Sequence, residues 1–319
     1  MTSDPVTSHP VTSAATIGLW TGTLDGVPVS EARDVIGEVE AQGWHSLWFG
    51  EAYGREALTA AQVYLSASTE LVVGTGIASI YARDAVATAS AARTLHAASN
   101  GRFVLGLGVS HAPLVERMRG HLYGKPVAAM REYLGALDAA PAAVAGEEVA
   151  PPRMIAALGP KMIELARDRA AGAHPYLVTP EHTAMARRIL DEGGTSHRPE
   201  LVVEQAAVVD PAAESDNDVW SERAHAHLNI YTGLPNYRNN WERLGFGQDD
   251  FVRGGSDKLA DAMVTKGMDA TLRRIREHID AGATSVLVQV LGSAMNVPPL
   301  SDWSRLAQAL ELGRTSGRG

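Results

Sequence analysis

Short apolar runs alternate with amphipathic segments along the chain from Thr16 onward. Eight of these runs are rich in β-branched or aromatic residues, and most are apolar at consecutive rather than alternate positions. Continuous apolar runs are typical of parallel strands in a sheet that is covered on both faces. The pattern therefore predicts eight strands, at Thr16–Trp20, Ser46–Phe49, Leu71–Thr75, Phe103–Leu107, Met154–Leu158, Ala173–Val178, Leu201–Val209 and Ser285–Val290.

Helix start and stop signals occupy the segments between these runs. In the first such segment, Val35, Ile36 and Val39 share one helical face, Ser30 is the expected N-cap and Gly43 is the expected end. Strands that alternate with helices of this kind build βα units. Eight units without a break in composition predict an α/β fold, a single (β/α)8 TIM barrel, rather than a two-domain dinucleotide-binding enzyme.

Two connections are longer than a minimal barrel needs. Residues 110–150 include a predicted helix near 125–139, and residues 211–283, between strands seven and eight, have room for about four helices. Insertions at the carboxyl ends of barrel strands usually shape or cover the active site. We expect one domain over residues 16–312, with the helical insertion at about 211–283.

The chain has 28 basic and 37 acidic residues, a net charge of −9, and no run of like charges. This balance gives nucleic-acid binding no support. The lack of cysteine excludes disulfides and thiolate metal sites. Residues 1–15 lack the basic start and apolar block of a signal peptide, and no apolar run approaches the roughly 20 residues of a membrane helix. We therefore expect a cytoplasmic protein without membrane contact, with mobile tails at residues 1–15 and 313–319.

Glycine recurs where predicted strands three, four and five end. The third strand ends with Gly74 and Gly76, the fourth with Gly106 and Gly108, and Gly159 follows the fifth. Strand ends of a barrel meet at one mouth, and glycine lets a backbone approach a ligand closely. The pattern fits a flat ligand over the mouth, and it fits equally well a strand end that glycine merely loosens.

The run Leu158-Gly159-Pro160-Lys161 has features of an anion site. Pro160 suits the first turn of a helix whose free amides would point back at the mouth, and Lys161 adds a positive charge there. A phosphate or an acidic tail could bind at this place. An ordinary helix start with a surface lysine explains the same residues, since no P-loop consensus is present.

Two titratable residues follow predicted strand ends. Glu51 comes directly after a strongly apolar strand, where a carboxylate is either held by fixed partners or functional, and we favour a catalytic or positioning role. His111 lies just beyond the fourth strand, and its imidazole titrates near neutral pH. We take His111 as the candidate acid or base, and Glu51 as a second residue of the same site.

Several other motifs are incomplete. Two Gly-x-Gly runs, which begin at Gly74 and Gly106, lack the third glycine of a dinucleotide fingerprint. His225 and His227 lie two residues apart in a predicted helix and point to different sides, so they are poor joint metal ligands. No metal site is expected.

Residues 227–241 are dense in aromatic and amide side chains. Such residues suit a lid over a planar polar ligand, and they suit equally well a hydrogen-bonded packing corner or a dimer contact. Candidate residues for contact with a small-molecule substrate are Tyr53, Tyr81, Tyr231, Trp241 and Gln289.

The chain resembles the bacterial luciferase-like flavin and deazaflavin oxidoreductases over residues 16–312. The resemblance is carried by Gly43–Glu51 (GWHSLWFGE), Gly74–Ile77 (GTGI), Tyr81–Asp84 (YARD) and Asn100–Gly108 (NGRFVLGLG). Within that family it is most similar to the branch that depends on coenzyme F420, a deazaflavin, because Ala157–Lys161 (ALGPK) and Leu234–Asn240 (LPNYRNN) also occur there.

The resemblance implies a (β/α)8 barrel with the flavin or deazaflavin ring over its mouth. In the family the third strand often ends in a cis peptide against the ring, and the matching bond here is Gly76–Ile77. By the same matching, Ser79 would lie beside the ring or its ribityl chain. The stretch Gly108-Val109-Ser110 would follow that chain, and Leu158 to Lys161 would receive the phosphate.

Two departures from the family pattern bear on the activity. Many members carry a histidine after the acid of strand two, where this chain has Ala52, and related deazaflavin sugar-phosphate dehydrogenases carry a carboxylate where His111 stands. The leading hypothesis is an F420-dependent oxidoreductase that transfers a hydride to or from a small organic substrate. An FMN-dependent monooxygenase and a non-catalytic cofactor-binding paralogue remain the alternatives. The family also implies a homodimer.

Overall fold

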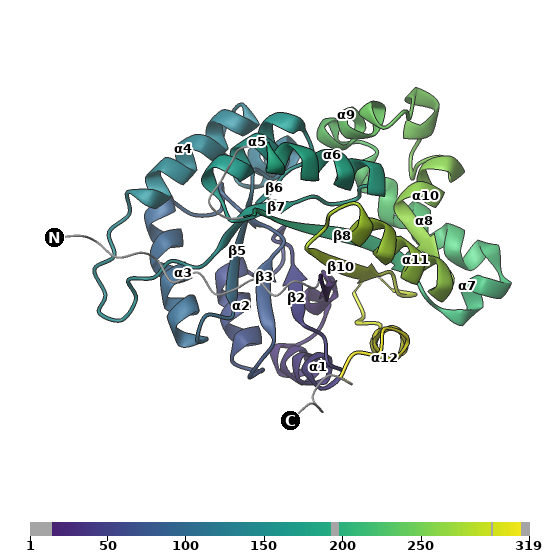
Figure 1. Ribbon diagram of the computed structural model, residues 1–319, viewed down its shortest axis with the longest axis horizontal. Coiled ribbons are helices and arrows are strands. Elements are labelled where there is room, and N and C mark those ends of the chain that lie inside the picture. Colours follow the sequence, from purple (N-terminus) through teal and green to yellow (C-terminus); the bar gives the residue numbers. More distant parts are fainter. Residues whose placement is uncertain (1–14, 193–197, 295, 314–319) are drawn as a thin grey trace.

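Eight parallel strands close into a barrel in the computed structural model, which describes residues 15–192, 198–294 and 296–313 (Figure 1). Strand β10 pairs with both β1 and β8, and these two pairings close the sheet. The predicted (β/α)8 barrel is therefore confirmed. The strands are β1 Thr16–Trp20, β2 Ser46–Phe49, β3 Val72–Thr75, β5 Phe103–Gly108, β6 Arg153–Ala156, β7 Gly172–His174, β8 Glu200–Val208 and β10 Ser285–Val290.

Strands β6 and β7 end earlier than the apolar runs predict. The chain leaves β6 after Ala156, and Gly159 then takes the N-cap position of helix α5. After β7, Leu177 has a left-handed φ of 53°, so its N–H turns away from the sheet and donates to the Glu204 side chain at 2.9 Å. Beyond these strand ends, Leu177 is buried in the core of the helical insertion, and Leu158 and Tyr176 pack against that core.

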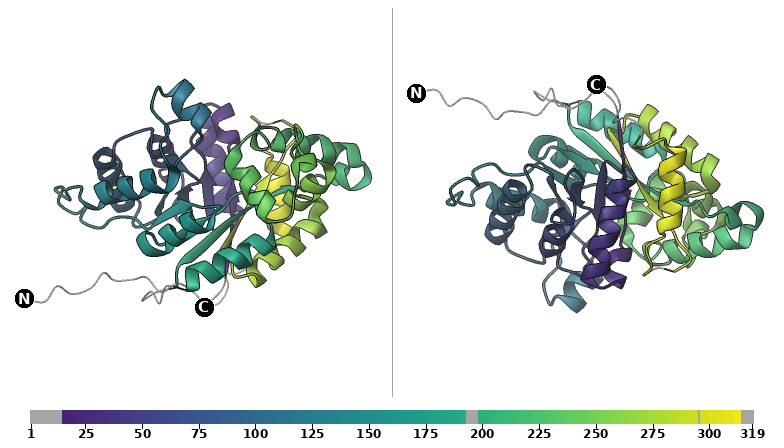
Figure 2. Two further views of the ribbon diagram at one scale, coloured as in Figure 1. Left: turned by 90° about the horizontal axis from the view of Figure 1, so that it is seen from above. Right: turned by 90° about the horizontal axis from the view of Figure 1, so that it is seen from below.

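Helices surround the barrel, and α1 and α12, from opposite ends of the chain, lie on the same side of it (Figures 1 and 2). Among the described residues no helix is long and apolar enough to cross a membrane. The helices of the barrel are α1 Val29–Ala41, α2 Ala57–Leu65, α3 Ala85–Ala98, α4 Pro126–Asp138, α5 Pro160–Arg169, α6 Pro180–Asp191, α11 Gly267–Asp280 and α12 Leu300–Ala309.

The expected cap of α1 is wrong. The helix begins at Val29, so Ser30 lies inside its first turn, and Pro28 at the N-cap has no side-chain acceptor. The predicted end is close, because Gly43 has a left-handed φ of 84° just beyond Gln42.

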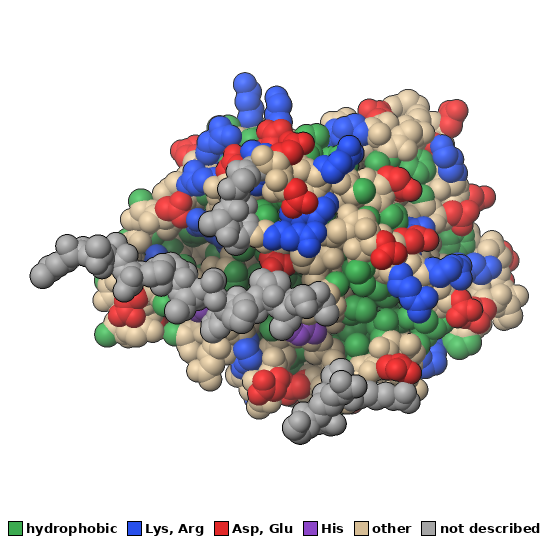
Figure 3. All heavy atoms as spheres, viewed as in Figure 1, with side chains coloured by type: hydrophobic (Ala, Val, Ile, Leu, Met, Phe, Trp, Pro, Cys, Tyr) green, Lys and Arg blue, Asp and Glu red, His purple; other side chains and the backbone are tan. Residues whose placement is uncertain are grey.

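On the face shown in Figure 3, acidic and basic side chains are interspersed, without a large patch of one sign.

The insertion after β8 has its own hydrophobic core. Four helices precede α11: α7 Pro211–Ser215, α8 Asn217–Tyr231, α9 Pro235–Arg243 and α10 Asp257–Met263, with short strand β9 Val264–Lys266 paired to β8. Their buried aromatic residues pack against Leu177 and the end of β8. Trp241 donates its indole N–H to the Leu177 carbonyl at 3.2 Å. Helix α9 is thereby anchored at the mouth end of β7.

The glycines of β3 and β5 make room for a tryptophan. A Cβ on Gly74 would overlap the Trp48 indole, and one on Gly106 would collide with the Thr75 carbonyl. The indole packs inside the barrel with Met154, Val202 and Leu287. Gly74 therefore faces Trp48 rather than the mouth, and its predicted contact with a ligand is replaced by a packing role.

Gly74→Ala is expected to lower the free energy of unfolding by about 1–3 kcal/mol, because the added methyl group overpacks the space that Trp48 fills. Urea unfolding followed by circular dichroism measures the change. Gly37→Ala is the matched control, because nothing lies within 4 Å of a Cβ there, and in helix α1 it should stabilise by roughly 0.5–1 kcal/mol. A Gly74→Ala protein as stable as the wild type would contradict the packing role.

Candidate functional site

The third strand ends in a bulge at the barrel mouth. The Gly76–Ile77 peptide bond is cis, as predicted, and the chain then forms the short strand β4, Ala78–Ser79, which pairs with β5. The Gly76 carbonyl accepts the Trp20 indole N–H at 2.9 Å. A Cβ on Gly108 would lie 2.5 Å from the Ile77 side chain. Gly108 therefore accommodates Ile77, whose side chain lies against β5.

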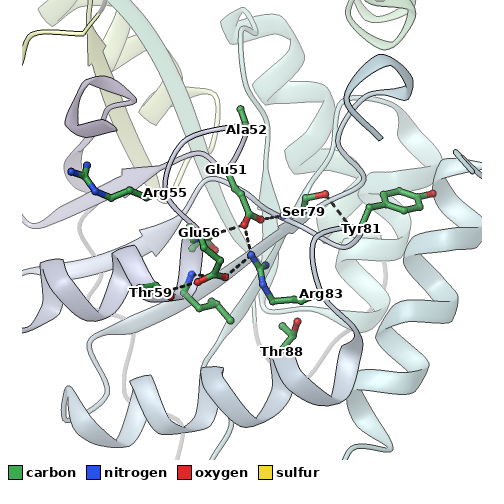
Figure 4. Close-up of polar contacts among 12 residues, drawn as sticks. Glu51, Ala52, Arg55, Glu56, Thr59, Ser79, Tyr81, Arg83 and Thr88 are labelled. Carbon is green, nitrogen blue, oxygen red and sulfur yellow. Dashed lines mark hydrogen bonds and ion pairs between the residues drawn. The ribbon is translucent and has the colours of Figure 1, made fainter. Parts of the chain in front are cut away.

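Glu51 supports this bulge from the end of β2. Its side chain is 3% exposed and forms an ion pair with Arg83. One carboxylate oxygen accepts the Ser79 N–H at 2.8 Å, and the other accepts the Ala57 N–H at 3.2 Å. Arg83 also pairs with Glu56, the N-cap of α2 (Figure 4). The carboxylate thus joins β4, the start of α2 and the loop that leads into α3.

Ser79 lies on the inner side of the same network. It is 1% exposed, and its hydroxyl oxygen accepts the Tyr81 N–H at 3.3 Å. Its backbone and hydroxyl therefore both belong to the hydrogen-bond network around Glu51. Tyr81 in turn accepts the Gly124 N–H at 3.1 Å, and its ring lies 5.8 Å from that of Tyr123.

His111 lies at the mouth beyond β5, after Ser110, which has a left-handed φ of 55°. Its partners come from α9: a hydrogen bond with the Asn236 side chain and a ring contact with Tyr237 at 5.9 Å. Burial lowers the pKa of His111, and the bond to Asn236 only partly offsets that effect. The imidazole is therefore neutral at pH 7. Asn236 orients this ring, whereas Glu51 contacts Ser79, Ala57 and Arg83.

A row of aromatic rings crosses the mouth from β1 to β5. Neighbouring centroids are 5.2 Å apart for Trp20 and Tyr176, 5.5 Å for Tyr176 and Tyr231, and 4.9 Å for Tyr231 and Tyr237, which then meets His111. Helices α8 and α9 supply Tyr231 and Tyr237. The insertion therefore builds one side of the mouth.

Two tyrosine hydroxyls of this row, those of Tyr176 and Tyr231, form hydrogen bonds. Tyr231 donates to the Tyr176 hydroxyl at 3.1 Å, and Tyr176 donates to the Gln289 side-chain carbonyl at 2.6 Å. His227 lies beside them, with its ring 5.4 Å from that of Tyr231. Burial lowers the pKa of His227 to about 4, so this imidazole is also neutral at pH 7.

His174 on β7 is a mouth residue that sequence reasoning missed. Its Nδ1–H donates to the Val202 carbonyl at 2.8 Å, while Nε2 has no hydrogen-bond partner among the described residues. A Cβ on Gly76 would lie 2.9 Å from that Nε2. Burial lowers the pKa of His174 to about 4, so it is neutral beneath the bulge. The sequence signal that could have identified His174 is a histidine inside an apolar strand.

The predicted anion site contains a second cation. Gly159 takes the N-cap position of α5 with Pro160 in the first turn, and Lys161 is exposed. A Cβ on Gly159 would lie 3.5 Å from the Arg243 guanidinium, which comes from α9. His182 donates to the Leu158 carbonyl at 2.8 Å and so holds the loop ahead of α5. Sequence reasoning missed Arg243, because only the fold brings α9 to this helix start.

The remaining residues that were predicted to belong to the site lie in different environments in the structure. Trp241 is 0% exposed in the core of the insertion, so its assignment as a substrate contact is wrong. Tyr53 is 76% exposed on the loop after β2, outside the aromatic row. The Ser110 carbonyl accepts the Tyr123 hydroxyl at 3.2 Å, and Val109 packs on the barrel core. Within the described ranges, no group of three or more possible ligands could hold a metal ion.

A known protein family matches most of the chain. Residues 9–279 match the family described as luciferase-like monooxygenase. The protein Rv3520c of Mycobacterium tuberculosis, whose name proposes a coenzyme F420-dependent oxidoreductase, is 29% identical over 282 residues, 78% of this chain and 80% of that protein. The 5,10-methylenetetrahydromethanopterin reductase of Methanolobus tindarius is 28% identical over 165 residues, 46% of this chain and 49% of that protein.

Solved structures share the fold at low sequence identity. An F420-dependent secondary alcohol dehydrogenase with an F420-acetone adduct superposes with a TM-score of 0.73 at 13% identity, over 93% of this chain and 99% of that one. The oxygenating constituent of 3,6-diketocamphane monooxygenase of Pseudomonas putida, in complex with FMN, gives 0.71 at 13% identity, over 94% and 98%. The fold is thus common to deazaflavin and flavin enzymes.

Proposed function

The chain belongs to the luciferase-like monooxygenase family, and from that premise we propose that it moves a hydride between coenzyme F420 and a small organic substrate at the barrel mouth. The observation that carries the proposal is the pairing of two features at one end of the barrel. The mouth end of β3, where Gly76 lacks a side chain beside Trp20 and His174, leaves room for a flat ring, and the start of α5, with Lys161 and Arg243, suits a phosphate. The similarity to Rv3520c favours the deazaflavin.

The residues present fit the cofactor that the family implies. The free amides at Gly159 to Lys161 and the guanidinium of Arg243 would hold its phosphate, and His182 fixes the loop ahead of them. The bulge at Ile77, supported by Glu51, would set the height of the ring. When bound, coenzyme F420 supplies or accepts the hydride at C5 of its ring.

The protein's own part is to orient the substrate, exclude water and move a proton. His111 is the proposed acid or base, and because it is neutral at pH 7 it is ready to accept a proton. The Asn236 side chain fixes the plane of its ring. Tyr231 and Gln289, joined through Tyr176, are the proposed substrate contacts. We also propose a cytoplasmic homodimer, as is typical of the family.

Arg243→Gln is expected to raise the dissociation constant for coenzyme F420 by about tenfold or more, because a charge-assisted bond to phosphate contributes about 1.5–3 kcal/mol. Isothermal titration at low and high salt measures the effect, which should shrink as salt screens the wild-type attraction. Arg238→Gln is the control on the same helix, since that guanidinium contacts Gln248 and the Phe251 ring. Equal losses in the two variants would argue against a phosphate at Arg243.

An FMN-dependent monooxygenase is the second candidate, favoured by the TM-score of 0.71 with the FMN-bound camphane enzyme. The two activities differ in their use of oxygen. Protein loaded with FMN and given a reductant should consume oxygen in proportion to substrate if it is a monooxygenase. Under the leading proposal, FMN-loaded protein should consume oxygen no faster than free reduced FMN does, and added substrate should not change that rate.

A further inference from the structure

A cavity of about 760 Å³ lies outside the sheet, beside helices α3, α4 and α5, which are neighbours around the barrel (Figure 1). Pro152 and Ala171 in its wall directly precede strands β6 and β7. The cavity is therefore at the amino ends of these strands, whereas the mouth is at their carboxyl ends. Its volume falls in the range of small-molecule sites, roughly 300–1,000 Å³.

The apolar wall of this cavity consists mainly of small residues. Ala89 and Ala92 come from α3, and Ala170 and Ala171 follow the end of α5. Alanine has no side-chain atom beyond Cβ, so the space that larger side chains would fill between α3 and α5 stays open. Leu105 of β5 also lines the cavity. An apolar group of a ligand can pack against these residues and leave water.

Four arginines and two aspartates line the same cavity, and we call it the arginine pocket: Arg93, Arg153, Arg167, Arg169, Asp138 and Asp168. Asp138 pairs with Arg153 at 2.6 Å through one oxygen and with Arg169 at 2.8 Å through the other. Asp168 pairs with Arg167 at 2.7 Å. The pocket thus has two positive charges in excess, although the whole chain has a net charge of −9.

Arg93 has a hydrogen-bonding edge without a partner. Its Nη1–H donates to the Pro141 carbonyl at 3.3 Å, and its Nε is buried with no hydrogen-bond partner in the part of the chain that the structure describes. Glu147, in the loop ahead of β6, accepts the Thr94 hydroxyl at 2.7 Å instead. A buried donor without a partner is costly, so this edge calls for an acceptor.

We propose that the arginine pocket binds a small organic carboxylate. The Nε–H and Nη2–H groups of Arg93 form the edge of a guanidinium that matches the two oxygens of a carboxylate, and the apolar body of the ligand lies on the alanine wall. A single negative charge suits the pocket better than two, because Asp138 and Asp168 already neutralise half of its positive charge. The site lies away from the mouth, so it does not depend on the proposed function.

The first test is calorimetric titration of the full chain with benzoate and with hexanoate, and with benzamide as the uncharged counterpart of benzoate. At least one of the two carboxylates should bind about tenfold or more tightly than benzamide, and its affinity should fall as salt rises. Inorganic phosphate should bind more weakly than that carboxylate. Equal binding of benzamide, no binding of either carboxylate at millimolar concentration, or phosphate binding as tight as the carboxylate, which means an adventitious ion only, overturns the proposal.

The second test locates the bound carboxylate with variants. Arg93→Gln should raise the dissociation constant about tenfold or more, and Arg93→Lys, which keeps the charge without the paired donors, should recover only part of that loss. Arg131→Gln, at an exposed position of α4, is the matched control and should bind as the wild type does. Arg243→Gln should also leave binding unchanged. Wild-type affinity in Arg93→Gln, or a loss in Arg243→Gln alone, overturns the proposal.

Hydrogen–deuterium exchange of the wild-type protein gives a readout that does not depend on the stability of the variants. Saturating benzoate or hexanoate should slow amide exchange in residues 139–152 and at the end of α5, which border the arginine pocket. Exchange in residues 108–115, at the mouth, should not change. Protection at the mouth alone, or no protection at the pocket, contradicts the proposal and leaves the proposed function to its own tests.

Discussion

Replacing Glu51 by alanine is expected to lower the free energy of unfolding by about 3–5 kcal/mol, because it leaves the Arg83 guanidinium buried without its main partner. The Ser79 and Ala57 N–H groups lose their acceptor as well. Urea unfolding followed by tryptophan fluorescence gives the value. Glu38→Ala, on the exposed face of α1, is the control and should change stability by about 0.5 kcal/mol at most.

A double variant separates the pair from its surroundings. Glu51→Ala with Arg83→Met removes both charges, so it should be less destabilised than the sum of the two single variants. A loss below about 1 kcal/mol for Glu51→Ala would show that the carboxylate is not the fixed support of β4 that its contacts indicate. The result bears on function, because β4 directly follows the Gly76–Ile77 bulge.

His111→Gln is expected to lower kcat for F420-dependent turnover by about 10²- to 10⁴-fold, the usual loss for an acid or base, while F420 still binds. His121→Gln is the matched control, because His121 is exposed in the following loop. Since burial lowers the pKa of His111, the neutral form should persist to more acidic pH than for an ordinary histidine. The midpoint of the acidic limb in the pH profile of wild-type kcat should therefore lie below the usual pKa range of histidine. That limb should be absent from the profile of the variant.

Unchanged turnover in His111→Gln would remove the proposed base. The alternative of a non-catalytic paralogue predicts no turnover in the wild type. The feature that suggests this alternative is Ala52, which stands where the family resemblance leads us to expect a histidine.

The barrel itself was readable from the sequence, because continuous apolar runs recur eight times with amphipathic segments between them. The helix start at Pro160 was also predicted correctly from a local motif, because capping acts over a few residues. The cis bond at Gly76–Ile77 was predicted correctly too, but from the family resemblance.

The partners of the site residues could not be predicted in this way. Arg83 lies 32 positions from Glu51, and Arg243 reaches Gly159 only through the folded insertion. Trp241 illustrates the opposite error, since an aromatic residue in a motif that suited a lid is the centre of a buried core. Glu204 and His174 read as ordinary members of apolar strands, and only their burial in the closed barrel shifts their pKa values.

The glycines show how one signal can have two physical causes. Backbone freedom and close approach both favour glycine at a strand end. In this barrel Gly74 makes room for Trp48 and Gly108 for Ile77, so packing explains them before any ligand does. Gly76 differs, because its missing side chain leaves Trp20 and His174 directly against the bulge.

Equilibrium titration of the purified protein with coenzyme F420 and with FMN, followed by the fluorescence of each cofactor, tests the central claim most directly. The account predicts that F420 binds at least about tenfold more tightly than FMN, a difference of roughly 1.4 kcal/mol, and that Arg243→Gln weakens F420 binding. Tighter binding of FMN, or binding of neither cofactor, would contradict it.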